Sequence, residues 1–441
     1  MPRYYKWFLV FALLVLGFSI TIGALAGLSY LQVPIVKMIL PFQKARPLHV
    51  TGALFWILSG AVGGVLFYIA DLRKNAILSS FSARIFTVLW MGSFVLIILS
   101  YLLGYYGGRE YWEFPPVLNI LILISWCFYL FTLFRYFRID PRNTPVYQYM
   151  WLTGALFFLF TFLEQNLWQL SWFRENIIRE MTVQWKSNGS LVGAWNQMIY
   201  GTAIYLMVQL SGDDQIARSR TAYFSYFLGL TNLIFNWGHH IYNVPTAGWI
   251  RTVSYTISMT EWILVISIIR GFKNKMKEFV QLKNSIVYRF LAGAEWWVFL
   301  NLLLALLMSI PAINRYTHGT HITVAHAMGT TIGINTFILL GSFSYLLKWD
   351  DRITTNGRLL FRRLYWTLHS FLLVFWLSLI VAGILKAIGQ SRIPMPDFAT
   401  IMKPVEPFLI LFVSAGWVMA GCLVWILWQL IKLAVNVNSE K

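Results

Sequence analysis

The sequence predicts an all-α membrane bundle of about twelve transmembrane helices, and three observations lead to this prediction. First, 58% of the 441 residues are hydrophobic and only 12% are charged, a composition that a soluble protein could not accommodate without large exposed apolar patches. Second, apolar runs near the roughly 20 residues needed to cross a bilayer recur along the chain. Third, Lys and Arg lie mostly in short loops between these runs. We expect a single transmembrane domain over residues 1–441.

The expected spans follow one another without a soluble domain, a Gly/Ser linker or a low-complexity stretch between them. In chain order they are 7–31, 48–70, 84–106, 116–137, 147–170, 188–210, 219–243, 250–271, 286–311, 318–347, 364–388 and 405–433. The first run continues past signal-peptide length and lacks a small-residue cleavage site, so we expect it to remain as a helix.

The distribution of basic residues predicts the orientation. The net charge of +18 could suggest nucleic acid, but these charges follow the loops as the positive-inside rule requires, so no nucleic-acid partner is expected. With the N-terminus inside, the inside loops hold Arg73, Lys74, Arg135, Arg138, Arg142, Arg218, Arg220, Lys273, Lys275, Lys277, Lys348, Arg352, Arg358, Arg362 and Arg363. The opposite loops are poorer in cations. The expected location is the inner (cytoplasmic) membrane, with both termini inside.

Cysteine chemistry is not expected in this chain. Cys127 and Cys422 both lie inside apolar runs, where they form neither a metal-binding spacing nor an expected disulfide. The chain also lacks the C-x-x-C-H motif for covalent haem attachment. Any covalently bound haem would therefore belong to a partner protein.

Six of the seven histidines map to the outer side of the predicted bundle. They are His49 at the start of the second span, His239 and His240 at the end of the seventh, and His318, His321 and His326 at the start of the tenth; His369 lies near the inner side. A single such residue could be a hydrogen-bonded structural histidine. Ionisable groups inside a bilayer are costly and usually functional, and histidines of several spans at one depth favour haem or metal ligation.

The spacing of these residues indicates which of them could bind the same haem or metal. His326 and Met328 are two residues apart and point roughly 200° apart on a helix, so they can serve two haems on opposite flanks. Met328 alone could equally be a packing residue. His239 and His240 are adjacent, roughly 100° apart, and could converge on one non-haem metal.

Five motifs, in this order along the chain, resemble one protein family. They are R-P-L-H (Arg46–His49), G-R-E-Y-W-E-F-P (Gly108–Pro115), G-H-H (Gly238–His240), T-E-W (Thr260–Trp262) and H-G-T-H-I-T-V-A-H-A-M (His318–Met328). Together they resemble the haem–copper oxidase superfamily, and more closely the large subunit of cytochrome c-dependent nitric oxide reductases. The resemblance covers nearly the whole chain.

The resemblance implies a role for each motif. His49 would be an axial ligand of a low-spin haem b, and His326 the proximal ligand of a high-spin haem b. His239 and His240 would bind a non-haem iron. Glu261 matches a family acid near that iron and would help deliver protons, a role that suits a buried carboxylate.

The resemblance also implies an acidic site near the outer surface. Glu110 and Glu113 match family residues that bind calcium between the haem propionates and a small subunit, and carboxylate oxygens suit that ion. The alternative is a solvated loop without calcium. The inner halves of the spans hold few acids, so protons are expected to enter from outside, past Glu110, Glu113 and the polar loop 171–187, and proton pumping is not expected.

The sequence departs from the family at one haem ligand. The family usually has a second histidine two residues after the proximal one, where this chain has Met328. If Met328 binds the low-spin haem, that haem should have a higher reduction potential than a bis-histidine site.

The sixth span departs from the family more strongly. The family's His-x-x-x-Glu, which supplies two iron ligands, aligns with Asn188 and Val192, so Asn188 would offer an amide oxygen and the glutamate would be lost. A slipped register would use Asn196 and Tyr200, which imitate the His-x-x-x-Tyr spacing of oxygen-reducing members. A third alternative is that Asn188 only caps the sixth helix.

The resulting functional expectation is reduction of nitric oxide to nitrous oxide at a haem–iron pair, with electrons from a small membrane-anchored cytochrome c subunit. The altered sixth span leaves oxygen reduction and nitric oxide dismutation open on the same scaffold. A haem subunit for electron transfer or gas sensing, without turnover, is a further alternative. A secondary transporter would explain the spans but not the histidines, and no clear inverted repeat is present.

Overall fold

The computed structural model describes residues 2–31, 38–73, 76–137, 139–140, 143–266 and 285–436. Within these ranges the chain is helical, with one isolated β-bridge between Arg109 and Trp112 and no extended strand. This confirms the predicted all-α class. Several basic residues used above to predict orientation lie outside the described residues: Lys74, Arg138, Arg142, Lys273, Lys275 and Lys277.

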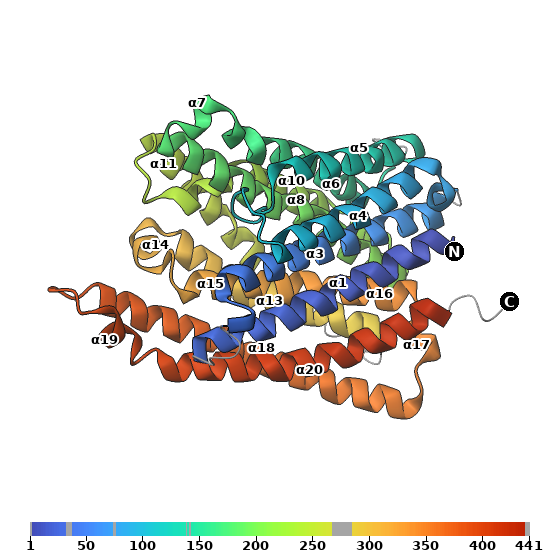
Figure 1. Ribbon diagram of the computed structural model, residues 1–441. Helices are drawn as coiled ribbons and strands as arrows, with labels where there is room; N and C mark the ends of the chain where they lie inside the picture. The colour runs from blue at the N-terminus through green and yellow to red at the C-terminus, as the bar shows by residue number, and fades with distance from the viewer. Residues whose placement is uncertain are drawn as a thin grey trace.

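The helices pack side by side with nearly parallel axes (Figure 1). The long helices are α1 (Arg3–Gly27), α3 (Phe42–Arg73), α4 (Phe81–Leu102), α5 (Asn119–Tyr136), α6 (Val146–Gln165), α8 (Ile177–Ser211), α10 (Arg220–Phe235), α11 (Gly248–Thr260), α13 (Ile286–Ser309), α18 (Thr355–Gln390) and α20 (Glu406–Asn436). One further long helix is composite: α15 (His321–Met328), the π-helix η7 (Gly329–Thr336) and α16 (Phe337–Leu346).

Shorter helical segments join these elements. They are η1 (Leu28–Leu31), η2 (Ile77–Ser79), η3 (Pro116–Leu118), η4 (Asn166–Gln169), α7 (Ser171–Arg174), α9 (Gln215–Arg218), η5 (Asn236–Ile241), α14 (Pro311–Thr317), α17 (Trp349–Arg352) and α19 (Phe398–Met402).

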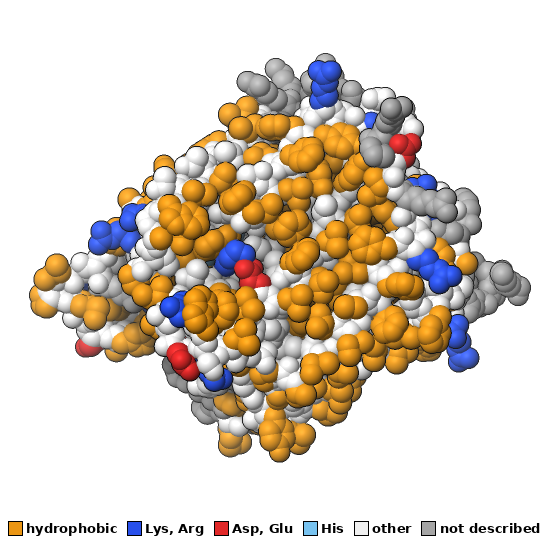
Figure 2. Space-filling view, turned by 90° about the horizontal axis from the view of Figure 1, so that it is seen from above, with side chains coloured by type: hydrophobic (Ala, Val, Ile, Leu, Met, Phe, Trp, Pro, Cys, Tyr) orange, Lys and Arg blue, Asp and Glu red, His pale blue; other side chains and the backbone are white. Residues whose placement is uncertain are grey.

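Nine helical segments of the described chain are long and apolar enough to cross a membrane. Each of the twelve predicted spans overlaps a helix within the described residues, but α8, α10 and α11 are not among the nine, so the predicted count of twelve is not confirmed. Helix α8 begins with a polar stretch, and the other two are short within the described residues. Apolar side chains are spread over the whole face in Figure 2, where charged groups are few: one basic and acidic pair lies near the middle, and most of the others lie toward the edges. The protein is a multi-pass membrane protein.

Helix α3 is the centre of the bundle. In its most apolar 18-residue stretch 83% of the residues are buried, compared with 39–56% in the other spans. Glycines allow α16 to approach it closely. A Cβ on Gly60 would lie 3.0 Å from Leu339, and one on Gly64 would lie 3.0 Å from the Ser342 hydroxyl. Small residues four apart are a common means of tight helix packing in membranes.

The two ends of the bundle differ in composition. The start of α1 and the end of α20 lie at the same end (Figure 1), where Lys6 Nζ donates to the Val435 carbonyl at 2.5 Å. Two elements that carry histidines, η5 and α15, lie toward the opposite end, together with α14, which is followed directly by His318. The predicted clustering of His49, His239, His240, His318, His321 and His326 at one end is consistent with this arrangement.

The sixth predicted span begins earlier than expected. Helix α8 starts at Ile177, and its N-cap is Asn176, whose side chain accepts from the backbone of Ile178 and Arg179 at 3.1 and 3.2 Å. Asn188 therefore lies inside the helix, and the alternative that it caps the helix is wrong. The region 171–187, expected to be a polar loop, consists mainly of α7 and the first turns of α8.

Candidate functional site

His49 is held between α3 and α1 by its Nδ1 atom. This nitrogen lies 2.8 Å from the backbone oxygen of Ser19 and 3.3 Å from its hydroxyl. A carbonyl oxygen can only accept, so Nδ1 carries the proton and Nε2 keeps the lone pair that can bind a metal. The ring lies directly against Gly23, where a Cβ would come within 2.6 Å of it. This geometry suits an axial haem ligand.

The packing of α3 against the composite helix brings His49 and Met328 to a similar depth. Trp56 Nε1 donates to the Thr336 hydroxyl at 3.0 Å, and inward of this bond Tyr68 bonds the Ser342 hydroxyl at 2.6 Å. The two helices therefore run in parallel register. His49 is seven residues outward of Trp56, on nearly the same face, and Met328 is eight residues outward of Thr336, so each lies roughly 10 Å further out.

His239 and His240 lie on η5, a 3₁₀ turn, and not on the end of an α-helix as expected. Successive side chains on such a turn are roughly 120° apart instead of 100°. The two rings are nevertheless adjacent, with centroids 4.2 Å apart. Gly238 is required here because a Cβ would lie 2.9 Å from Ile250 and from Ser254 on α11. The G-H-H motif thus presses the turn against α11 while both imidazoles remain on its other sides.

Asn236 connects this turn to α11 through its side chain. Its Oδ1 lies 3.0 Å from His239 Nδ1 and accepts from the Ser258 hydroxyl, and its Nδ2 donates to Glu261 at 3.4 Å. Its backbone oxygen accepts from Ser254 at 2.7 Å. Glu261, the predicted acid, is therefore one amide away from a predicted metal ligand.

His240 packs against α8. Its ring stacks on Trp185 with centroids 5.6 Å apart, and a Cβ on Gly189 would lie 3.3 Å from it. Asn188, next to Gly189 in the helix, is 2% exposed, and its Oδ1 has no hydrogen-bond partner. A buried amide oxygen without a partner at the level of His240 suits a metal donor.

The residues of the alternative register, Asn196 and Tyr200, lie further inward on nearly the same side of α8. Asn196 follows Trp185 and Gly189 along the same helical line, and its Oδ1 is also buried without a partner. Tyr200 is one turn further and close enough to Glu261 to interact electrostatically. Both registers therefore place polar atoms near η5 and α11, and the choice between them stays a prediction.

His326 lies at the end of α15, one turn before the π-helix. Its Nδ1 is buried without a partner, and its backbone oxygen accepts from Asn301 Nδ2 at 3.1 Å. The ring is close enough to those of His239 and His240 to interact electrostatically with them. Met328, also within α15, is partly buried, so the expected angle of roughly 200° between His326 and Met328 applies. π-Helical segments are often found at functional sites.

The remaining outer histidines have different surroundings. His318 contacts the backbone of His240 and lies 6.1 Å from Trp185, between ring centroids. Burial lowers the pKa of His318, against the smaller opposing effects of the hydrogen bond with the His240 backbone and of the nearby Glu110 carboxylate. His321 is buried beside Tyr30. His369 lies apart from this group, against Gly293 and Phe337.

The outer loop between α4 and η3 presents Glu110 and Glu113 to one arginine. Arg46, one turn before His49, donates to Glu110 at 2.6 Å and to Glu113 at 2.7 Å. Burial raises the pKa of the Glu113 carboxyl, although Arg46 acts in the opposite direction. The second oxygen of Glu113 is buried without a partner. Arg46 thus compensates the charge of both carboxylates, while the Arg46 and Glu110 side chains remain 38% and 39% exposed, so the alternative of a solvated loop without calcium stays open.

The G-R-E-Y-W-E-F-P motif folds as a tight turn. A Cβ on Gly108 would overlap the Trp112 carbonyl, and Tyr111 has a φ of 76°, in the left-handed region. Burial raises the pKa of Tyr111 to about 12. Trp112 and Phe114 are buried and anchor the turn. The acids between these anchors are thereby directed at Arg46.

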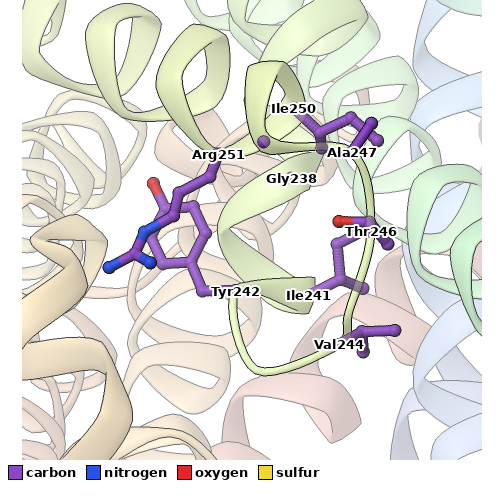
Figure 3. Close-up of a pocket in the computed structure, with 9 residues that line it drawn as sticks. Gly238, Ile241, Tyr242, Val244, Thr246, Ala247, Ile250 and Arg251 are labelled. Carbon is purple, nitrogen blue, oxygen red and sulfur yellow. The ribbon is translucent and has the colours of Figure 1, made fainter.

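A cavity of about 150 Å³ lies behind the histidine turn. Figure 3 shows Tyr242 and Arg251 side by side on one flank, and Ile241, Val244 and Thr246 along the loop on the other. Gly238 belongs to its lining. The cavity therefore borders the backbone of the turn.

Across the described ranges, no group of three or more His, Cys, Asp or Glu side chains is placed to hold one metal ion. His239 and His240 would need a donor of another kind, such as the Asn188 oxygen. Glu110 and Glu113 would likewise need oxygen donors from outside this set to complete a calcium site.

Sequence reasoning missed the residues that orient the histidines. Ser19, Asn236, Asn301 and Trp185 all contact a histidine or its backbone. Asn236 had the strongest available signal, since a polar residue three positions before a histidine can reach it within a tight turn.

The chain matches one protein family over residues 3–418, described as Cytochrome C and Quinol oxidase polypeptide I. It is 23% identical to a nitric oxide reductase subunit of Stutzerimonas stutzeri, over 92% of this chain and 89% of that one. It is 21% identical to Cbb3-type cytochrome c oxidase subunit CcoN1 of the same organism, over 93% and 90%.

A solved structure, a haem–copper terminal oxidase dimer studied by cryo-electron microscopy, shares the fold with a TM-score of 0.66 and 12% identity, over 99% of this chain and 85% of that one. The chain therefore belongs to the cytochrome c and quinol oxidase polypeptide I family of the haem–copper oxidase superfamily.

Proposed function

We propose that the protein reduces nitric oxide to nitrous oxide at a haem and a non-haem iron, with electrons from a cytochrome c subunit. The observation that carries this proposal is the His239–His240 turn beside His326, with the Nδ1 atom of His239 already engaged by Asn236. The 23% sequence identity to a nitric oxide reductase subunit, over 92% of this chain, supports the proposal. Inner-membrane location, with the centre toward the periplasmic side, belongs to the same proposal.

The donor groups fit the proposed cofactors. Membership of the family implies haem groups. We assign a low-spin haem b to His49 and Met328, and a high-spin haem b to His326. The non-haem iron would be held by His239 and His240, with Asn188 as a further donor. When bound, the haem and iron would bind the diatomic molecules and pass on to them the electrons from the cytochrome c subunit.

The residues of the chain would position the reaction and move its protons. Two nitric oxide molecules, two electrons and two protons give one nitrous oxide and one water. Glu261, held by the Asn236 amide, is placed to pass a proton toward the histidine turn. Glu110 and Glu113 lie on the outer route, where Glu110 is near His318 and His318 contacts His240.

The expected partner is a small membrane-anchored cytochrome c subunit, since several relatives are named as subunits of larger enzymes. The chain contains no haem-attachment motif of its own. The lipid bilayer surrounds the bundle, and nitric oxide is the proposed substrate.

Calcium at Glu110 and Glu113 stays a prediction. Arg46 engages one oxygen of each carboxylate and leaves at least the second Glu113 oxygen free. Calcium takes 6–8 oxygen ligands, so most of its ligands would come from outside these two residues.

The test is a gas balance with isotope-labelled nitric oxide, using the purified, haem-loaded complex and a reduced cytochrome c. The proposal expects labelled nitrous oxide as the product. Release of dinitrogen and oxygen would instead identify nitric oxide dismutation. A complex with two haems, no non-haem iron and no nitric oxide consumption would identify an electron-transfer or gas-sensing subunit.

Oxygen reduction is the second candidate. Two observations favour it: the position of Tyr200 close to Glu261, and the identity to cytochrome oxidase subunits. Oxygen consumption that Tyr200→Phe abolishes, without nitrous oxide formation by the unaltered protein, would select this candidate.

A further inference from the structure

Asn236 joins four groups around the histidine turn. Its Oδ1 accepts from His239 Nδ1 and from Ser258, its Nδ2 donates to Glu261, and its backbone oxygen accepts from Ser254. Three of these partners, Ser254, Ser258 and Glu261, lie on or at the end of α11. The side chain therefore fixes the turn to that helix.

The orientation of the amide follows from its partners. A carboxylate accepts hydrogen bonds, so the amide nitrogen faces Glu261 and the amide oxygen faces His239. An oxygen cannot donate, and His239 must therefore donate from Nδ1. The proton resides on Nδ1, and Nε2 carries the free lone pair. Metal-binding histidines commonly give their second ring nitrogen to such an oxygen.

The backbone around the ring is also held. Asn314 of α14 donates from Nδ2 to the His239 carbonyl at 3.1 Å, and Gly238 packs without a side chain against Ile250 and Ser254. With both its backbone and Nδ1 fixed, the imidazole can turn its Nε2 in only a narrow range of directions.

We propose that Asn236 is a positioning residue that fixes the tautomer and the direction of His239 for binding the non-haem metal. This inference rests on the proposed metal centre. It adds to that proposal a residue that would not itself touch the metal.

Removal of the amide tests the inference. In the full complex, stripped of non-haem metal by a chelator, Asn236→Leu should bind iron(II) about 10–100-fold more weakly than the unaltered protein. Bound iron in excess of haem is counted at buffered free iron concentrations. Asn236→Asp keeps an oxygen acceptor for His239 and should lose less affinity than Asn236→Leu.

Two controls separate the outcomes. Asn232→Leu removes an amide one turn earlier, whose side chain donates to the Leu228 carbonyl of its own helix and has no other partner among the described residues, and should retain the affinity of the unaltered protein. The absorbance of the low-spin haem reports whether each variant is folded. If Asn236→Leu does not fold, the iron affinities of Asn236→Asp, Ser258→Ala and the unaltered protein are compared instead. Ser258→Ala leaves the His239 bond in place and should bind iron as tightly as the unaltered protein, and Asn236→Asp should bind it more weakly than both.

The contrary results are distinct. Unchanged iron affinity in a folded Asn236→Leu, or equal losses in the Leu and Asp variants, would overturn this inference and leave the metal centre standing. An unaltered protein that binds no iron beyond its haem would overturn the metal centre itself.

Discussion

His49 and His239 are both anchored through Nδ1, but by different kinds of group. The oxygen that faces His49 belongs to the backbone of Ser19, inside the regular helix α1, whereas the oxygen that faces His239 belongs to the side chain of Asn236. No substitution can remove a backbone carbonyl, but a single substitution can remove an amide. The His49 position is therefore fixed by how two helices pack, and the His239 position by one residue of a short turn.

Each histidine also follows, by three residues, a polar side chain that reaches a carboxylate. Arg46 reaches Glu110 and Glu113, and Asn236 reaches Glu261. The first connection compensates charge, and the second does not. The outer carboxylates are thus held as ion pairs, whereas Glu261 is held by a neutral donor.

The largest effect is expected where helix packing creates the His49 site. Gly23→Leu places a side chain where even a Cβ would lie 2.6 Å from the ring. Overpacking of this kind costs about 1–3 kcal/mol, and displacement of the ring should remove most of the low-spin haem absorbance. Gly17→Ala on the same helix is the control, because its nearest neighbour, Leu427, would be at an ordinary 3.7 Å. Full haem content in Gly23→Leu would contradict the packing account.

Met328, the proposed second ligand of the low-spin haem, gives the next effect. Met328→His should lower the reduction potential of that haem, within the roughly 0.8 V that axial ligands span, because a thioether ligand raises it. A spectroelectrochemical titration measures the change. An unchanged potential and spectrum would identify Met328 as a packing residue.

Loss of the ion pairs of Arg46 with Glu110 and Glu113 should have a moderate effect on stability. Arg46→Gln leaves two carboxylates without their cation, and loss of a charged hydrogen bond costs about 1–3 kcal/mol. Solvent screening places the effect near the lower end, since the Arg46 side chain is 38% exposed. The thermal unfolding midpoint should fall by a few degrees. Arg392→Gln, in the exposed α18–α19 loop, should leave the midpoint unchanged.

The smallest effect is expected from Ser19→Ala. It removes the hydroxyl that lies 3.3 Å from His49 Nδ1 but leaves the backbone oxygen at 2.8 Å. The cost should be below about 1 kcal/mol, with an unchanged low-spin haem spectrum. A spectrum altered as strongly as by Gly23→Leu would show that the hydroxyl, and not the backbone, is the anchor.

The difference between the two regions also explains what could be predicted from the sequence. His49 and His326 lie on helices whose regular rise places them at a definite depth, so their place near one end followed from span boundaries alone. The first turns of α8 were not predicted, because charged residues such as Arg179 and Lys186 are typical of a polar loop. The Asn236 connection depends on the path of a 3₁₀ turn, and no periodicity in the sequence encodes that path.

The π-helix after Met328 changes the directions in which successive side chains point along the composite helix. Hydrogen bonds from i to i+5 accommodate additional residues within a turn, so the side chains of α16 are rotated relative to those of α15. Loss of one residue within Gly329–Thr336 would be absorbed by conversion of a π-turn to an α-turn and would leave Leu339 and Ser342 against Gly60 and Gly64. His326 and Met328 would keep their directions. The segment thus allows the composite helix to gain or lose a residue during divergence while the inner packing surface and the outer ligand positions both stay in place.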